Sequence, residues 1–225
     1  MLCAASLVCM IRIALTGGIA AGKSTVSQHL RECGIAVIDY DELTHILQEP
    51  GSPAIMLLEQ RFGPDVIDAD GRVDRAALAA RVFGGAQGDN TALADLNAIM
   101  HPLIDQLAAE AERHVLAVNP NAVIVHDIPL YADVHEHLPV TFDHVMTVEA
   151  PVSTRVQRMM RTRAMSREQA LARIVNQATS EQREQLADAV IDGNAAIPDM
   201  DCQVDQLLRS WHVPMAATHA PSERL

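Results

Sequence analysis

The stretch that decides the fold is Gly17-Gly18-Ile19-Ala20-Ala21-Gly22-Lys23-Ser24-Thr25. It matches the pattern G-x-x-x-x-G-K-[ST] of a phosphate-binding loop, in which glycines let backbone N–H groups turn toward phosphate oxygens. Residues 11–16 form a short apolar run typical of a buried strand, and residues 25–32 are typical of a helix. The N-terminus of that helix would place a positive partial charge beside the same anion. The segment therefore predicts a site for a nucleoside triphosphate.

Two residues of this loop have expected partners on the nucleotide. Lys23 is the only lysine of the chain, and its compact ammonium suits the outer phosphates. The Ser24 hydroxyl is expected to reach Mg²⁺. The other predicted ATP contacts are Gly18, Ala20, Ala21, Gly22 and Thr25.

Composition and charge exclude several classes of function. A formal net charge of −12 argues against non-specific binding of DNA or RNA. The apolar residues 1–10 lack the positive start of a signal peptide and lead directly into the first strand, so we expect residues 1–9 to be an N-terminal extension. No other run is long enough to span a membrane. We therefore expect a cytoplasmic protein with reduced thiols, in which Cys33 is a small buried residue and no cysteine has metal-binding spacing.

Apolar strands alternate with helical segments along the chain, which predicts an α/β fold with a parallel sheet flanked by helices. Further strands are expected at 35–38, 122–130, 144–148 and 189–192.

A long helical stretch separates the second strand from the third and exceeds an ordinary crossover, so it predicts an inserted subdomain. Its last two helices are expected at 91–99 and 102–118, joined at Met100-His101-Pro102. The predicted single domain of residues 10–211 has a core at 10–41, 119–152 and 181–211 and a helical insertion at 42–118, and a flexible tail is expected at 212–225.

Asp41 follows the second predicted strand, at the edge where open parallel sheets bind ligands. A carboxylate there can accept the proton of an attacking alcohol. Two alternatives stay open. Asp41 could instead cap the helix that follows it, and Asp39 competes for the role of base.

Arginines gather between residues 155 and 173, with Glu168 as the only acid among them. Arg155, Arg158 and Arg161 recur every three residues and would form a stripe on one side of a helix. Such a stripe is usually a solvated face. Arginines that close over a transferring phosphate, however, stabilise its spread charge, and a mobile lid would also expel water.

Asp127 ends an apolar strand, which is the usual position of an acid that holds Mg²⁺. The alternative is a structural acid that caps the turn before Pro129. The N-K-x-D motif of GTPases is absent from the sequence, and no metal-ligand motif occurs among the ten histidines.

Together these motifs resemble those of dephospho-CoA kinases. The resemblance extends over about residues 10 to 210 and rests on residues 14–25, 37–41, 49–51, 70–75, 96–102, 127–130, 157–158, 173–177 and 187–192. It implies a P-loop NTPase/kinase fold and transfer of the ATP γ-phosphate to the 3′-hydroxyl of dephospho-CoA, the last step of coenzyme A synthesis. The remaining alternatives are another small-molecule P-loop kinase and a nucleotide-binding regulatory ATPase.

The resemblance also implies residue roles. Asp41 would be the base, Lys23 and Arg158 would stabilise the phosphates, and Ser24 would lie near Mg²⁺. The inserted helices would hold dephospho-CoA, with Asp41, Arg75 and His101 as substrate contacts. Residues 153–180 would form the lid.

The chain departs from the family pattern in its lid. Thr162 stands where an arginine is common and Arg163 where an acid is common, so the candidates for the closing arginine are Arg155, Arg161 and Arg163. The expected partners are ATP and dephospho-CoA, with no nucleic acid or membrane, and the expected assembly is a monomer or a weak homo-oligomer.

Overall fold

The structure is a computed structural model that describes residues 10–84 and 91–214. Two compact units make up the chain. The first comprises Met1–Ile38 and Glu112–Leu225, and the second comprises Asp39–Ala111. The expected extension at 1–9 and the part of the expected tail beyond residue 214 lie outside the described residues. Among the described residues, no helix combines the length and apolar character needed to cross a membrane.

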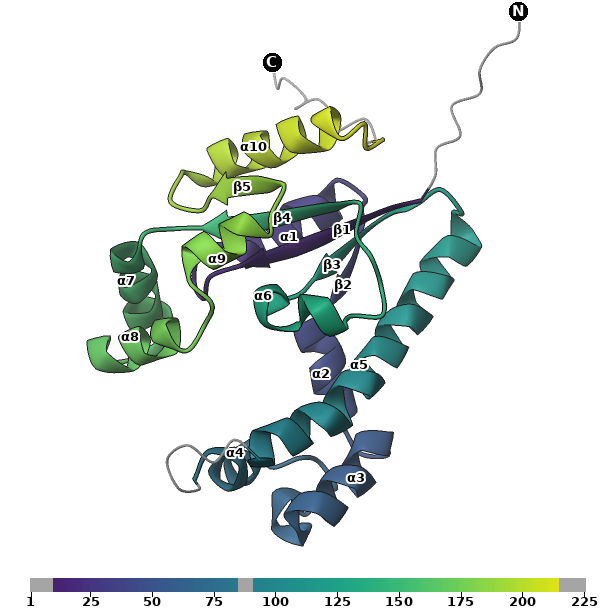
Figure 1. Ribbon diagram of the computed structural model, residues 1–225, viewed down its shortest axis with the longest axis vertical. Coiled ribbons are helices and arrows are strands. Elements are labelled where there is room, and N and C mark those ends of the chain that lie inside the picture. Colours follow the sequence, from purple (N-terminus) through teal and green to yellow (C-terminus); the bar gives the residue numbers. More distant parts are fainter. Residues whose placement is uncertain (1–9, 85–90, 215–225) are drawn as a thin grey trace, which may run out of the picture. The chain divides into compact units, whose positions relative to one another are not determined.

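A parallel five-stranded sheet in the order β2-β3-β1-β4-β5 confirms the predicted α/β fold (Figure 1). The register sets Leu15 of the central strand β1 opposite Asp127 on β3 and opposite Met146 on β4. The carboxyl ends of these three strands therefore meet at one edge, which is where the phosphate loop begins. The strands are β1 (Ile11–Gly17), β2 (Ala36–Asp39), β3 (Val123–Asp127), β4 (His144–Glu149) and β5 (Ala189–Asp192).

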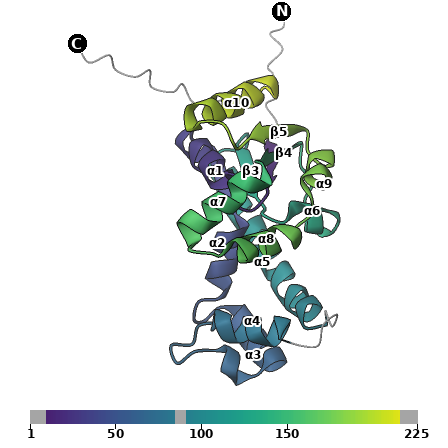
Figure 2. The same cartoon turned by 90° about the vertical axis from the view of Figure 1, so that its left-hand side faces the viewer.

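Two helices of the first unit, α1 (Lys23–Glu32) and α10 (Ile197–Ser210), lie next to each other in both views (Figures 1 and 2). Both contribute fully buried side chains, such as Leu30 and Leu208, to one aliphatic core with Ile13 of the sheet. The other helices of this unit are α6 (Tyr131–Val134), α7 (Val152–Arg163), α8 (Arg167–Val175) and α9 (Ser180–Gln185), with a 3₁₀ turn η2 at His135–His137.

The second unit is helical and has its own core around Leu58, Phe62 and Val66. Its elements are α2 (Tyr40–Leu47), α3 (Pro53–Phe62), η1 (Pro64–Val66), α4 (Arg75–Phe83) and the first part of α5 (Thr91–Val118). The expected insertion at 42–118 overlaps this unit, but residues 112–118 belong to the first unit. In that unit Glu112 accepts a hydrogen bond from Arg12 Nε of β1 at 3.0 Å.

The prediction of two helices joined at residues 100–102 is wrong, because α5 runs without interruption from Thr91 to Val118 and contains Pro102. An interior proline costs about 3 kcal/mol, since it removes one hydrogen bond and crowds the carbonyl four residues before it. Met100, which is buried, and apolar neighbours such as Leu103 pack on the core of the second unit and offset that cost. Packing has therefore overridden the local signal.

Candidate active site

The phosphate loop joins β1 to α1 in the first unit. Gly22 is the N-cap residue of α1, and no side chain of the described residues caps the helix there. The first backbone N–H groups of α1 are therefore left for an anion. Ala20 has a φ of 60°, which is uncommon for a residue with a Cβ. The loop therefore contains a left-handed residue that is not a glycine, which the sequence pattern did not indicate.

Two glycines bring neighbouring segments directly onto the loop. A Cβ built on Gly18 would lie 2.6 Å from the guanidinium carbon of Arg155. A Cβ built on Gly193, which follows β5, would overlap the carbonyl oxygen of Ala21. Helix α7 and the β5–α10 connection therefore contact the loop at positions that only glycine can occupy without a shift.

Lys23 and Asp127 form an ion pair beside the loop. The carboxylate comes from the end of β3, where its side chain is 2% exposed, and the ammonium comes from the first residue of α1. The register of β1 and β3 explains the pairing, because it sets Asp127 next to the strand that leads into the loop. Both residues were predicted from sequence as site residues, but the contact between them was not.

Arg158 of α7 is half-buried and binds the backbone of the site. Its Nη1 donates to the carbonyls of Ala20 at 3.2 Å and Ala21 at 2.8 Å, and its Nη2 donates to the carbonyl of Gly193 at 2.8 Å. The guanidinium thus joins the phosphate loop to the segment after β5. The family resemblance implies that Arg158 stabilises the phosphates, and no sequence pattern indicates these carbonyl contacts.

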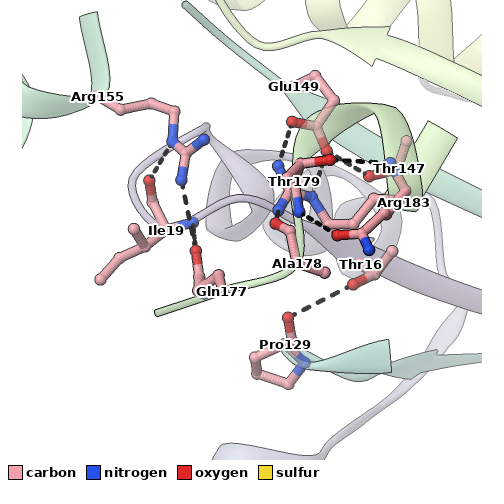
Figure 3. Close-up of polar contacts among 11 residues, drawn as sticks. Thr16, Ile19, Pro129, Thr147, Glu149, Arg155, Gln177, Ala178, Thr179 and Arg183 are labelled. Carbon is pink, nitrogen blue, oxygen red and sulfur yellow. Dashed lines mark hydrogen bonds and ion pairs between the residues drawn. The ribbon is translucent and has the colours of Figure 1, made fainter. Parts of the chain in front are cut away.

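Arg155 is buried and binds the peptide of Ile19, as Figure 3 shows. Its Nε donates to the Ile19 carbonyl at 2.9 Å, while the Ile19 N–H donates to the side-chain oxygen of Gln177 at 2.9 Å. Burial, the largest cause, lowers the pKa of the Arg155 guanidinium. We call Arg155 and Gln177 the loop clasp, because they hold both polar groups of one loop residue. Of the three lid candidates, Arg161 and Arg163 are exposed.

A buried bidentate ion pair joins α9 to β4 near this clasp (Figure 3). Arg183 donates from Nε and Nη2 to the two carboxylate oxygens of Glu149, each at 2.6 Å, and the Thr147 hydroxyl donates to Glu149 at 2.8 Å. Arg183 also donates to the carbonyl of Ala178, the residue after Gln177. The pair therefore anchors the chain where it leaves the clasp. No local sequence pattern indicates this pair, because its two members lie 34 positions apart.

In the second unit, Asp39 and Asp41 have different roles. The Asp39 carboxylate caps α2, because it accepts hydrogen bonds from the backbone N–H groups of Asp41 at 2.9 Å and Glu42 at 3.2 Å. The cap role considered for Asp41 therefore belongs to Asp39. The Asp41 side chain is exposed in the first turn of α2.

The other predicted substrate contacts also lie in the second unit. Arg75 is exposed at the start of α4. His101 is half-buried on α5, one turn before Asp105. Burial raises the pKa of the Asp105 carboxyl, and the charge of His101 acts in the opposite direction. In the first unit, Ser24 is exposed in the first turn of α1.

The family model that matches this chain and two of its relatives all carry the description dephospho-CoA kinase. A family model described as dephospho-CoA kinase matches residues 11–199. A dephospho-CoA kinase of Bifidobacterium longum is 47% identical over 203 residues, which cover 90% of this chain and 97% of that protein. A dephospho-CoA kinase of Frankia casuarinae is 40% identical over 198 residues, covering 88% of this chain and 82% of that protein.

Solved structures agree on the fold. A crystal structure of a Thermus thermophilus protein superposes with a TM-score of 0.73 at 30% identity and covers 90% of this chain and 98% of that one. A dephospho-CoA kinase of Campylobacter jejuni has a TM-score of 0.56 at 24% identity, with 88% and 96% covered, and supports the fold alone.

Proposed function

The chain belongs to the dephospho-CoA kinase family, and from this premise we propose that it transfers the γ-phosphate of ATP to the 3′-hydroxyl of dephospho-CoA. The observation that carries the proposal is the Lys23–Asp127 ion pair beside a phosphate loop with an uncapped helix N-terminus. The pair brings together, at one edge of the sheet, the Lys23 ammonium, which is proposed to bind the phosphates, and the Asp127 carboxylate, which is proposed to bind a metal ion. A cytoplasmic location and a monomer or weak homo-oligomer are parts of the same proposal.

Lys23 is proposed to exchange partners during the reaction. Its ammonium is paired with Asp127 in the structure, and the outer phosphates of bound ATP would offer it a stronger concentration of negative charge. Once Lys23 turns toward the phosphates, the Asp127 carboxylate loses this partner. The exchange would couple nucleotide binding to a change of partner at Asp127, the proposed metal ligand.

Kinases that use ATP generally need a divalent cation, and we propose that it is Mg²⁺. The donor set fits, because Mg²⁺ prefers hard oxygen ligands and this edge of the sheet offers the Asp127 carboxylate and the Ser24 hydroxyl. When bound, the cation neutralises charge that develops on the phosphate oxygens.

Arg158 is proposed to stabilise the transferring phosphoryl group together with Lys23. Its support is its contact with the carbonyls of Ala20 and Ala21, which puts a guanidinium against the loop backbone. Residues 153–180 are proposed to act as a lid, in which the exposed Arg161 and Arg163 are the candidates to close over the phosphates and exclude water.

Asp41 is proposed to accept the proton of the 3′-hydroxyl as it attacks. Two observations support this role. Asp39 already caps α2, so the exposed Asp41 carboxylate is not needed for that purpose. In addition, β2, which ends two residues before Asp41, belongs to the same sheet as β1 and β3. Arg75 and His101 are proposed to contact dephospho-CoA, whose phosphates suit a guanidinium.

The decisive experiment is mass spectrometry of the product formed from Mg-ATP and dephospho-CoA, with fragmentation to locate the new phosphate. We expect a single phosphorylation at the 3′-position, and we expect Lys23→Ala to lower kcat about 10²–10³-fold, as loss of one preorganised charge-stabilising donor does elsewhere. Phosphorylation of nucleoside monophosphates in preference to dephospho-CoA would favour another small-molecule kinase. ATP hydrolysis that needs no acceptor and yields no phosphorylated product would favour a regulatory ATPase.

A further inference from the structure

A histidine, a cysteine and two aspartates converge at the end of α1 that is remote from the phosphate loop. His29 and Cys33 come from α1 and its C-cap, and Asp201 and Asp205 come from α10. The distance from His29 Nε2 is 2.8 Å to Asp205 Oδ1 and 3.7 Å to Cys33 Sγ. Cys33 lies ten residues beyond Lys23, which is roughly 15 Å along the helix. The group is therefore separate from the phosphate site.

We propose that His29, Cys33 and Asp205 bind a divalent transition-metal ion, with Zn²⁺ as the best fit. One ligand atom from each of the three lies within 4.8 Å of the others. A tetrahedral zinc ion with Zn–N of about 2.0 Å and Zn–S of about 2.3 Å holds its nitrogen and sulfur ligands about 3.5 Å apart. The 3.7 Å between His29 Nε2 and Cys33 Sγ is close to that value. The carboxylate of Asp205 need only withdraw slightly to admit the ion.

Asp201 lies where it could become the carboxylate partner that metal-binding histidines normally have. Its Oδ1 lies 3.6 Å from Nδ1 of His29, the ring nitrogen opposite the one that faces the cluster. This separation is longer than a hydrogen bond, and without metal Nε2 of His29 is bonded to the Asp205 carboxylate instead. A metal on Nε2 would leave the ring proton on Nδ1, where a small approach of Asp201 would let its carboxylate accept that hydrogen bond and orient the ring. The two helices would then supply a carboxylate–histidine–metal series.

The three proposed ligands differ in solvent exposure, from the buried thiol to the partly exposed carboxylate. This suits a metal ion that has one coordination position open to water. Cys33 is 5% exposed, while the side chains of His29 and Asp205 are 16% and 24% exposed. The thiol side is thus enclosed, and the carboxylate side faces water, which can supply a fourth ligand. Such an ion would join α1 to α10, which already pack on one core.

The sequence could not reveal this group, because each helix contributes only two of its members. His29 and Cys33 are four residues apart, as are Asp201 and Asp205, so each pair shares one helix face. Only the packing of α1 on α10 joins the pairs. The competing interpretation is a metal-free His29–Asp205 ion pair that fastens the two helices.

The test uses Co²⁺ as the probe and the full chain carrying Cys3→Ser and Cys9→Ser, without nucleotide. We expect a near-ultraviolet sulfur-to-cobalt charge-transfer band that Zn²⁺ abolishes by displacement, and a rise in Tm with Zn²⁺ concentration. Cys33→Ala should remove the band. The matched control is Cys202→Ala, which removes an exposed cysteine on α10 and should keep the band.

Two further variants separate the metal site from the ion pair. Asp205→Asn should weaken Co²⁺ binding at least about tenfold, and Asp201→Asn should weaken it about 10–100-fold, as expected for loss of the carboxylate behind a metal-bound histidine. Far-ultraviolet circular dichroism verifies that each variant is folded. Absence of the band in the parent, or its persistence in Cys33→Ala, would overturn the proposal and leave the ion pair as the function of the group.

Discussion

Replacing Arg155 by methionine tests the loop clasp most directly. Methionine keeps an unbranched side chain in the buried space but removes the hydrogen bond from Nε to the Ile19 carbonyl at 2.9 Å. A hydrogen bond from a charged donor contributes about 1.5–3 kcal/mol, and the longer contact to Gln177 at 3.4 Å adds little. The variant no longer has to bury a charged guanidinium, which offsets part of this loss. We therefore expect a net destabilisation of about 2 kcal/mol.

The assay is urea unfolding of the nucleotide-free protein, supported by thermal unfolding. For a chain of this size, about 2 kcal/mol corresponds to a decrease in Tm of about 4–8 °C. Arg161→Met is the matched control, because Arg161 lies on the same helix and is exposed, and surface changes of this kind stay within about 0.5 kcal/mol. If Arg155→Met and Arg161→Met unfold at the same urea concentration, the assignment of Arg155 to the clasp is wrong.

The division of roles between neighbouring aspartates gives another prediction: Asp41→Asn should lower kcat about 10²–10⁴-fold with little change in stability, whereas Asp39→Ala should cost about 0.5–2 kcal/mol of stability through loss of the α2 cap. Steady-state kinetics and urea unfolding of both variants test this division. If Asp39→Ala lowered kcat and Asp41→Asn lowered stability, the two roles would have to be exchanged. Stability should also fall in acid through Glu112, because its hydrogen bond with Arg12, the largest cause, holds the pKa of this carboxyl below its usual value of 4.5. The folded state then binds fewer protons than the unfolded state, so the stabilisation is present above pH 4.5 and is lost as pH falls through the lower folded pKa. Urea unfolding at a series of pH values should show a shallower acid loss in Glu112→Gln, and an unchanged slope would exclude this contribution.

Much of this protein could be predicted from local patterns. The phosphate loop, its flanking strand and helix, and the alternation of strands and helices are local features that a sequence displays directly. A capping box is local in the same way: its spacing is visible at Ser166 and Gln169, and the structure contains both of its hydrogen bonds. Pro102 is the exception, because a local breaking signal was overruled by packing on the core of the second unit.

Contacts between distant segments belong to tertiary structure alone. The Lys23–Asp127 pair joins residues 104 positions apart, and the pair of Glu149 and Arg183 joins residues 34 apart. Arg155 shows the reason most clearly: three arginines at regular spacing look alike in sequence, yet only helix packing decides which is buried against Ile19 and which faces water. Residue type and spacing specify which chemistry is available. The environment of each charge, and therefore its role, depends on which other segments fold against it.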